Sequence, residues 1–182
     1  MVRIPTLERK ENLAPEHHAI YDAIAQSRGE VRGPFAVLLH SPEIAERTAY
    51  LGAYIRFESQ LDPGDLELAT LTVARELDCK HEWAAHLAHA RKIGVPEETI
   101  TAIHNRKAPS GLSVEEAQIV SYVHELLRSH RVSTATFQSM LDRFGVKGLV
   151  ELTATVGYYA MLACTLNAFE MESVTAPDHL KI

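Results

Sequence analysis

Residues 67–89 read ELATLTVARELDCKHEWAAHLAH, and this stretch is the most informative of the 182 residues. Its apolar side chains recur at helical spacing and do not alternate as they would in a strand. Asp62 followed by Pro63 is a helix-start signal, which predicts a helix from Pro63 to about Leu77. A break near Asp78 and a stop at Gly94 predict a second helix from Lys80 to Ile93. The stretch therefore folds as two consecutive helices.

The rest of the chain shows the same helix signals and no alternating run typical of a strand. We expect further helices at 15–27 (with Gly29 as the stop), from Pro34, at 42–58 after the cap Ser41, at 96–105, at 114–130 after a capping box at Ser113 and Glu116, at 133–145 and at 148–171. In the helix at 42–58, Ile44, Leu51 and Ile55 are expected to be buried. The prediction is an all-α chain of seven to nine helices, forming a single domain over 1–182 with a leader at 1–14 and a tail at 172–182.

Composition narrows the functional classes. A hydrophobic fraction of 46% is enough to fill a core, so disordered and fibrous classes are excluded. A net charge of −6 disfavours nucleic acid as a partner. Two cysteines cannot form the disulfide scaffold of a small secreted protein, and the sequence has neither the apolar stretch of a signal peptide nor a run that suggests a membrane span. We expect a cytoplasmic protein with no membrane partner.

Reactive side chains gather on one stripe of the helix that follows Asp78. On a helical wheel that sets Glu82 at 0°, Cys79 lies at about +60°, His86 at about +40° and His89 at about −20°. This stripe overlaps the apolar face, and a buried carboxylate or imidazole is costly unless it is paired. Pairs of this kind are candidates for proton transfer. His81 points away from the stripe, near about −100°, so its partners must come from another element or it is exposed.

The histidines also raise the question of a metal. His81 and His86 are five residues apart, so they do not share a helix face as the two histidines of a zincin motif do. Glu82, His86 and His89, at spacings of four and three, are compatible with a metal site. Our prediction for the site contains no metal, and a metal bound by these three residues is kept as an alternative.

The cysteines allow a thiol chemistry to be considered. Cys79 is expected at a helix start, where the helix dipole favours a thiolate. Position 82, where a redox Cys-x-x-Cys pair would have its second sulfur, holds glutamate. Cys164 lies in an apolar run and is interpreted as a small core residue.

These residues resemble a known family. Glu67, followed after eleven residues by Cys79-x-His81-Glu82-Trp83-x-x-His86 and then by Ala90-x-x-x-Gly94, is similar to the carboxymuconolactone decarboxylase family of the alkylhydroperoxidase D-like (AhpD-like) superfamily. Upstream Ser41-Pro42-Glu43 and downstream Gly157-Tyr158-Tyr159 extend the resemblance over most of the chain. It implies an all-α fold and a homo-oligomer, which we expect to be a trimer, hexamer or dimer.

The resemblance also implies site residues. The hydroperoxidase branch of the superfamily has a proton relay of glutamate, histidines and two cysteines, which places its members on Glu67, Cys79, His81 and His86. The second cysteine falls on Glu82, and this departure removes the disulfide cycle. The decarboxylase branch commonly has glutamate there. We therefore expect His86 as general acid/base, Glu82 as its partner or a second acid, and Glu67 as the residue that orients the relay.

Substrate binding is less constrained by the sequence. An arginine fork matches a substrate carboxylate, and Arg56 and Arg75 are the candidates, although each is also compatible with a surface ion pair. Trp83 either packs in the core or stacks on the substrate. The Glu82–His86 pair could itself be only a structural i,i+4 pair.

The leading interpretation is a lyase of aromatic catabolism. It would be a carboxy-lyase without an organic cofactor, acting on a small carboxylated lactone or related acid. Two alternatives remain: a peroxidase of the peroxiredoxin type that uses Cys79 as a lone thiol, and a non-catalytic oligomer that binds a small ligand. The sequence does not identify the substrate.

Overall fold

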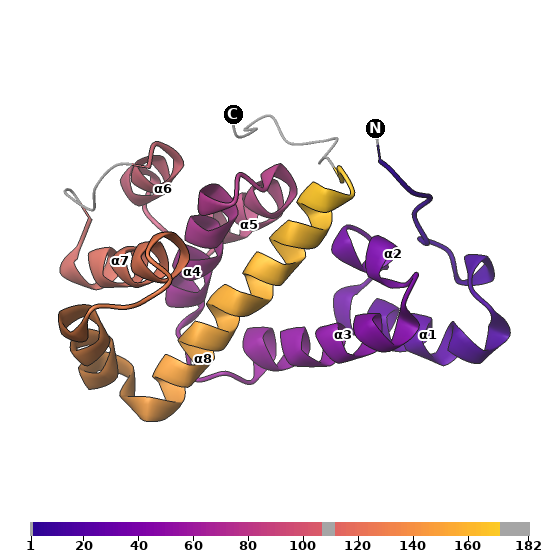
Figure 1. The fold of residues 1–182 in the computed structure, drawn as a ribbon, viewed down its shortest axis with the longest axis horizontal. Helices are drawn as coiled ribbons and strands as arrows, with labels where there is room; N and C mark the ends of the chain where they lie inside the picture. The colour runs from indigo at the N-terminus through magenta and orange to yellow at the C-terminus, as the bar shows by residue number, and fades with distance from the viewer. Residues whose placement is uncertain (1, 107–111, 172–182) are drawn as a thin grey trace.

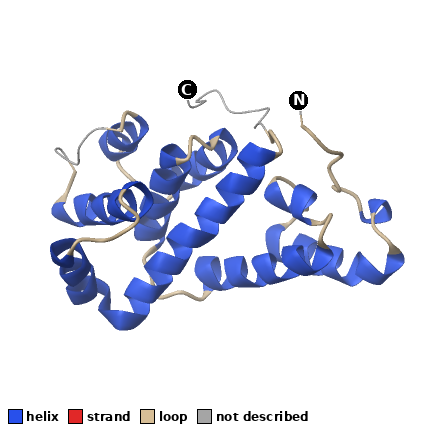
Figure 2. Cartoon of the chain, in the orientation of Figure 1, coloured by secondary structure: helices blue, strands red, loops and turns tan. Residues whose placement is uncertain are grey.

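The computed structural model describes residues 2–106 and 112–171, and every regular element in these ranges is a helix (Figure 2). The elements are two 3-10 turns, η1 (Lys10–Asn12) and η2 (Pro15–His17), and eight α-helices: α1 (His18–Arg28), α2 (Pro34–Leu38), α3 (Pro42–Phe57), α4 (Pro63–Glu76), α5 (Lys80–Lys92), α6 (Glu97–His104), α7 (Val114–Arg128) and α8 (Thr134–Ala168). The all-α prediction of seven to nine helices is confirmed for the described residues.

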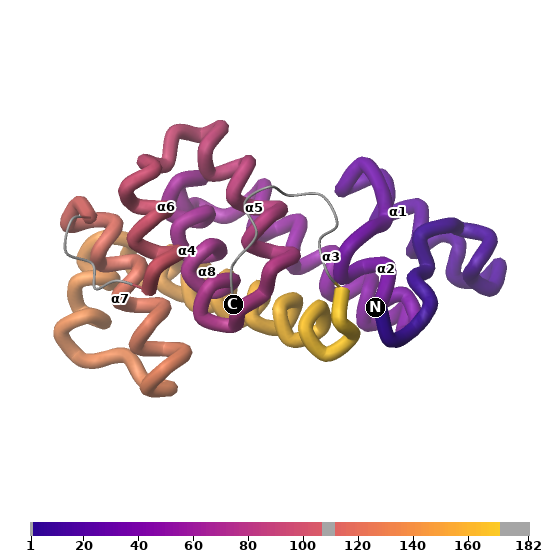
Figure 3. Tube along the Cα trace, turned by 90° about the horizontal axis from the view of Figure 1, so that it is seen from above, coloured from indigo at the N-terminus to yellow at the C-terminus, as the bar shows by residue number. Residues whose placement is uncertain are grey.

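Helix α4 is the centre of the larger core. It packs against α5, α6, α7 and α8. Helices α4 to α7 lie on one side of α8, and the N-terminal helices lie on the other (Figures 1 and 3). Every residue from Leu66 to Ala74 is buried, as expected for a helix enclosed on all sides. Thr70 and Thr72 satisfy their hydroxyls by donating to the carbonyl oxygens of Leu66 and Leu68, at 2.8 and 2.7 Å. Any other polar group on this helix must find a partner inside the protein.

The N-terminal helices form a second, smaller core. Helices α1, α2 and α3 pack together, and α2 and α3 also contact α8 (Figure 1). This core contains Leu13, Ile24, Val31, Phe35, Leu39, Ala45 and Ala49. Part of the predicted leader joins it, because the backbone N–H of Leu7 donates to the carbonyl oxygen of Ala36 at 2.8 Å. The predicted tail at 172–182 lies outside the described residues.

Helix α8 runs through the middle of the molecule and connects the two cores (Figure 1). Gly145 has φ 64° and ψ 179°, which breaks the helical geometry where the sequence predicts a stop. Within the described residues, α8 is the one helix long and apolar enough to cross a membrane by length and composition. Of its most apolar window, 56% is buried, and α2, α3, α4, α5 and α7 all pack on it. Packing in the core therefore accounts for its apolar character.

The buried face of α3 differs from the prediction. Ile55 is buried, but Ile44 and Leu51 are 52% and 43% exposed. The face that α3 turns inward consists instead of small residues, among them Ala45, Ala49 and Gly52. Gly52 is required there, since a Cβ atom at this position would lie 2.1 Å from the hydroxyl oxygen of Tyr158 on α8. The close approach of α8 to α3 therefore selects the small residues for the interface.

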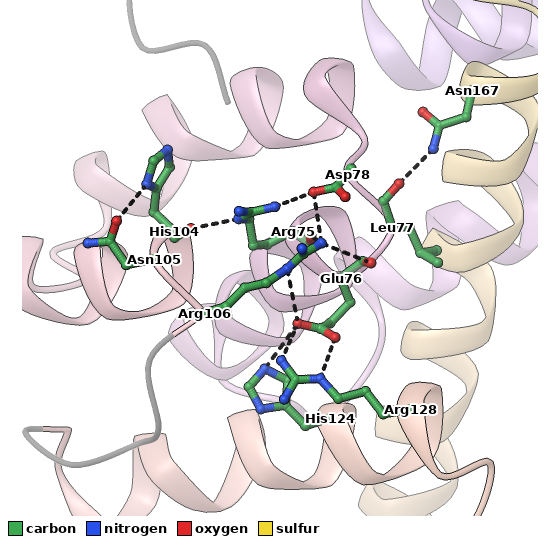
Figure 4. A network of polar contacts seen from close by, with 10 residues as sticks. All are labelled: Arg75, Glu76, Leu77, Asp78, His104, Asn105, Arg106, His124, Arg128 and Asn167. Atoms are coloured by element: carbon green, nitrogen blue, oxygen red, sulfur yellow. Dashed lines mark hydrogen bonds and ion pairs between the residues drawn. The ribbon is translucent and has the colours of Figure 1, made fainter. Parts of the chain in front are cut away.

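A polar network holds the turn between α4 and α5, which sets where α5 begins (Figure 4). Asp78, in the left-handed region at φ 49°, forms ion pairs with Arg75 and, at 2.8 Å, with Arg106. On the other side of the turn, the side-chain amide of Asn167 on α8 donates to the carbonyl oxygen of Leu77 at 2.7 Å. The start of α5 is thereby fixed against α6 and α8.

The carboxylate of Glu76 is the anionic centre of the same network (Figure 4). Its side chain is 8% exposed and accepts two hydrogen bonds of 2.6 Å from Arg128, with His124 at 3.4 Å and Arg106 at 3.8 Å. Burial alone would raise the pKa of Glu76, but Arg128, His124 and Arg106 outweigh it and hold this pKa below the ordinary value.

We predict that Glu76→Gln lowers the free energy of unfolding by about 2 kcal/mol at pH 7, because it leaves the guanidinium groups of Arg128 and Arg106 beside a neutral amide. The lowered pKa means that the contribution of Glu76 is present above pH 4.5 and is lost as the pH falls below it. Urea unfolding at pH 7 and pH 4 should thus show a difference from wild type that shrinks at the lower pH. Glu115→Gln, at an exposed position of α7, is the control and should change stability by less than about 0.5 kcal/mol. An unchanged stability at pH 7 for Glu76→Gln would contradict the structural role.

Candidate active site

Glu67 and His86 form a buried pair where α4 and α5 pack together. The side chain of Glu67 is 4% exposed, and its Oε2 lies 2.8 Å from Nδ1 of His86, whose side chain is 15% exposed. Since α4 is buried on all sides here, the carboxylate of Glu67 cannot reach water and depends on this imidazole. The structure thus brings Glu67 and His86, two residues of the predicted relay, into direct contact.

Glu82 lies on the other side of the same imidazole. Its Oε2 is 3.4 Å from Nε2 of His86, and its side chain is 6% exposed. Burial alone would lower the pKa of His86, but the hydrogen bonds and charges of Glu67 and Glu82 outweigh it and raise this pKa to about 9. At neutral pH His86 is therefore an imidazolium held between two carboxylates.

A cavity of about 180 Å³ opens beside Glu82 and His86. Its walls come from five helices, α1, α2, α3, α5 and α8, and from the segment that joins α1 to α2. The lining residues are Arg28, Glu30, Arg32, Gly33, Pro34, Phe35, Arg56, His81, Glu82, Ala85, His86, Tyr158, Tyr159 and Leu162. At about 30 Å³ per water molecule, it has the capacity for a small organic molecule. The acid–base pair and three arginines thus share one small cavity.

His81 lines this cavity and faces another element, which is the first of the two alternatives left open by the sequence. Its partner element is the segment before α2, where a Cβ atom on Gly33 would lie 2.7 Å from Nε2 of His81. Gly33 also has φ 56°, so glycine is favoured there on both grounds. Burial lowers the pKa of His81, and the charges of Arg32 and His86 add to this effect. His81 is therefore neutral at pH 7.

Two tyrosines of α8 complete the wall next to His86. The ring of Tyr159 makes an edge contact with the imidazole at 4.9 Å between centroids, and Tyr158 packs edge-on against Tyr159 at 5.2 Å. Burial and the charges of Glu82 and Glu67 raise the pKa of Tyr159, so its hydroxyl stays protonated. The sequence showed these tyrosines only as part of a resemblance in the last helix, without a role.

Cys79 does not face the cavity. It precedes α5 as the N-cap residue with extended backbone geometry, is fully buried, and packs with Ala163 and Leu166. Burial raises the pKa of its thiol to about 12, and the charge of Glu82 adds to this. The expected helix-start thiolate is thus disfavoured, because the side chain lies in an apolar cluster. Cys164, interpreted as a core residue, is exposed.

Of the predicted substrate-binding residues, Arg56 lines the cavity, whereas Arg75 and Trp83 do not. Arg75 donates to the carbonyl oxygen of His104 at 2.6 Å and pairs with Asp78, so its guanidinium is used in the turn of Figure 4. Trp83 is 1% exposed in the main core, with its ring 5.5 Å from that of His104. These two residues are structural, which corrects the expectation that they bind substrate.

His89 takes no part in the cavity. Its side chain is 51% exposed, and Nε2 lies 3.8 Å from Oε1 of Glu67. Across residues 2–106 and 112–171, no group of three or more His, Cys, Asp and Glu side chains is placed to hold a metal ion. The set of Glu82, His86 and His89 is therefore not assembled as a metal site.

The fold and the sequence of the site segment both identify relatives. Residues 42–125 match the model of the carboxymuconolactone decarboxylase family. This segment, slightly less than half of the chain, is similar to the family to which the sequence resemblance points. A comparison with curated protein sequences found no significant match.

Three solved structures are similar to this chain in fold. A peroxidase-related protein from Silicibacter sp. TM1040 has a TM-score of 0.72 at 16% identity, covering 93% of this chain and 92% of its own. A protein from Agrobacterium tumefaciens, named as a candidate antioxidant defence protein AhpD, has a TM-score of 0.65 at 18% identity, covering 79% and 100%. A cysteine-to-alanine variant of the debrominase Bmp8, in complex with 2,3,4-tribromopyrrole, has a TM-score of 0.70 at 13% identity, covering 97% and 93%. At these identities the likeness concerns the fold alone.

We predict that an NMR titration of the His86 ring gives a pKa near 9, and that Glu67→Gln moves it down toward the ordinary value, because burial is then less well offset. The raised pKa has a consequence for stability: the contribution of His86 is fully present below pH 6.5 and is lost as the pH rises through about 9.

Urea unfolding between pH 6.5 and 9.5 provides a second measurement of the same coupling. The stability of the wild type should fall more over this range than that of Glu67→Gln. A His86 ring that titrates at its ordinary value in the wild type would refute the coupling of the three side chains.

Proposed function

We propose that the chain is a carboxy-lyase of the carboxymuconolactone decarboxylase type, acting without an organic cofactor on a small carboxylated lactone or related acid. One observation carries the proposal: His86, protonated between Glu67 and Glu82, lies in the wall of a small cavity lined by arginines. The family match over residues 42–125, which includes all three relay residues, supports the choice of reaction.

In this reaction the bond between the substrate carboxylate and its carbon breaks, and carbon dioxide leaves. The electron pair moves into the conjugated lactone as a dienolate, so the substrate itself delocalises the charge. His86 then donates its proton to carbon, which forms the C–H bond and leaves a neutral imidazole, and a proton from water restores the imidazolium. Glu82, which also lines the cavity, is the partner or second acid.

The supporting roles follow from position. Glu67 does not line the cavity and acts on His86, whose ring orientation and charge it sets. Tyr159 retains its proton and is a hydrogen-bond donor beside His86 for oxygen that becomes negative during the reaction. Arg56 supplies positive charge at the cavity, which favours an anionic substrate.

The two alternative functions have less support from the site. A peroxidase using Cys79 would need a thiolate that substrate can reach, and this thiol is fully buried with a raised pKa. The names of the peroxidase-related and AhpD structures keep that chemistry worth testing. A non-catalytic ligand-binding role gives no reason for a protonated histidine between two buried carboxylates.

We predict that the wild type releases carbon dioxide from carboxymuconolactone, and that His86→Asn reduces kcat by about a thousandfold because the proton donor is lost. Glu82→Gln should also lower kcat, and activity should fall as the pH rises through about 9, where His86 loses its proton. Cys79→Ser is the control that should keep its rate, and circular dichroism confirms folding of each variant. Undiminished turnover by a folded His86→Asn variant would refute the assignment.

The thiol route is tested in the same set of proteins. A hydroperoxide is supplied with a thiol reductant, and turnover is compared between the wild type and Cys79→Ser. A rate in the wild type that disappears in Cys79→Ser would favour the peroxidase over the lyase. Capture of the lactone without product, observed by mass spectrometry, would favour the binding protein.

We also propose that the protein is a homo-oligomer, and that the apolar face shared by α3 and α8 forms the subunit contact. Five apolar side chains of these two helices are more than 40% exposed: Ile44, Tyr50 and Leu51 on α3, and Val146 and Val150 on α8. A groove of about 290 Å³ runs between the two helices and has Leu51, Ile55 and Val150 in its lining. Apolar surface of this kind is characteristic of protein interfaces.

We predict that light scattering after size exclusion gives a mass above 20.2 kDa for the wild type and a smaller assembly for Leu51→Glu or Val150→Glu. A charge at either position would have to be buried in the subunit contact, which is costly. Val114→Glu, at a 70% exposed apolar residue of α7, is the matched control and should leave the mass unchanged. A monomeric wild type at micromolar concentration would contradict the proposal.

A further inference from the structure

Arg28, the last residue of α1, carries a guanidinium that has no carboxylate partner in the described part of the chain. Among the described residues, no acidic oxygen lies within 4.0 Å of it, and its Nε is buried without a hydrogen bond. Its Nη2 makes only long hydrogen bonds of 3.4 Å, to the carbonyl oxygen of Ala49 and the hydroxyl of Tyr158. The guanidinium lies over the ring of Phe35, 4.0 Å from the centroid. The protein therefore holds this cation in place without neutralising it.

An unneutralised guanidinium in a partly buried position is costly for the free protein. The fork of an arginine matches the two oxygens of a carboxylate, and such charge-assisted hydrogen bonds are among the strongest in proteins. Arg28 lines the cavity of the candidate active site, so a ligand in the cavity can supply the missing anion. The surrounding packing maintains this position, since a Cβ atom at Gly52 would lie 2.7 Å from Nη2 of Arg28.

The other two arginines of the cavity are placed differently. Arg32 is 76% exposed and forms an ion pair of 2.9 Å with Glu30, so its charge already has a partner. Arg56 is exposed and lies 5.1 Å from the ring centroid of Phe57, itself a 64% exposed residue. Both belong to the outer part of the cavity. Arg28 is thus the arginine whose charge most needs a ligand.

A second unpartnered group lines the same cavity. Nδ1 of His81 is buried and makes no hydrogen bond to any residue of 2–106 or 112–171. His81 comes from α5, the helix that carries Glu82 and His86. Around the cavity, the three arginines and protonated His86 exceed the acidic groups Glu30, Glu82 and Glu67 by one charge. The cavity therefore favours an anionic ligand, although the whole chain has a net charge of −6.

We propose that Arg28 binds a carboxylate of a small anionic substrate, and that His81 Nδ1 makes a further hydrogen bond to the same ligand. The inference rests on the proposed function, because the ligand bound by Arg28 is the substrate on which Glu67, Glu82 and His86 would act. It assigns substrate recognition to residue 28, which precedes the family-matched segment 42–125 and which sequence reasoning did not single out.

Isothermal titration calorimetry tests this with paraconate, a saturated five-membered lactone that carries one carboxylate, and with its uncharged methyl ester. The wild type should bind paraconate more tightly than the ester. Arg28→Gln should weaken paraconate binding by between about tenfold and a hundredfold and leave ester binding unchanged, because only the charged contact is lost. Arg28→Lys should restore part of the preference, since it keeps the charge without the fork. Arg47→Gln, which removes a positive charge from the exposed face of α3, should bind both ligands as the wild type does.

Thermal unfolding separates recognition from a structural role. Without ligand, Arg28→Gln should melt at the same temperature as the wild type or higher, because it removes an uncompensated charge. Paraconate at one fixed concentration should raise the melting temperature of the wild type more than that of Arg28→Gln. A ligand-free Arg28→Gln that melts well below the wild type, or equal paraconate binding by the two proteins, would overturn the assignment. The assignment would also be overturned if the wild type did not bind paraconate at millimolar concentrations. The same holds if only Arg56→Gln, and not Arg28→Gln, lost paraconate binding.

The test remains separate from that of the lyase. Binding of paraconate through Arg28, without carbon dioxide release from any carboxylated lactone, would support the inference and refute the proposed function. Carbon dioxide release that is equally efficient in Arg28→Gln, with unchanged KM, would support the function and refute the inference.

Discussion

The hydrogen bond between Glu67 and His86 is the constraint on which the site depends. Helix α4 is buried on all sides from Leu66 to Ala74, so a carboxylate in its middle is tolerated only if another element brings a partner to it. Helix α5 does so at 2.8 Å. The need to satisfy one buried carboxylate therefore fixes the register of the two helices and places His86, together with Glu82 on the same helix, beside the cavity.

The local features of this arrangement could be predicted from the sequence because they depend on neighbours along the chain. Proline starts, caps and the capping box at Ser113 define helix boundaries within a few residues. Glu82 and His86, one turn apart, share a helix face by geometry alone. Apolar spacing has a limit, however: it cannot distinguish a face covered by the same chain from one left exposed, so Ile44 and Leu51 were expected in the core and are exposed.

What the sequence could not predict depends on contacts between distant segments. Arg28, Gly33 and Tyr158 meet His86 in one cavity from three parts of the chain. The wheel angle of Cys79 was also misleading, because an N-cap residue with φ −84° and ψ 93° does not follow helical geometry. Its side chain leaves the stripe that Glu82 and His86 share and enters an apolar cluster with α8. Helical periodicity holds inside a helix and fails at the N-cap residue that precedes it.

The cavity has two chemically different walls, and they come from different parts of the chain. At one wall lie the residues that hold or move a proton, which are Glu67, Glu82 and His86. They lie within the family-matched segment 42–125, and the imidazole of His86 couples the two glutamates. The cation that lacks a partner, Arg28, lies outside that segment, on a small core of α1, α2 and α3 that packs on α8. Among the described residues, no hydrogen bond or ion pair joins Arg28 to the three relay residues, so a change at Arg28 can alter which anion binds while leaving the relay intact. Such a division is one physical route by which a single helical fold can apply the same proton chemistry to different acids.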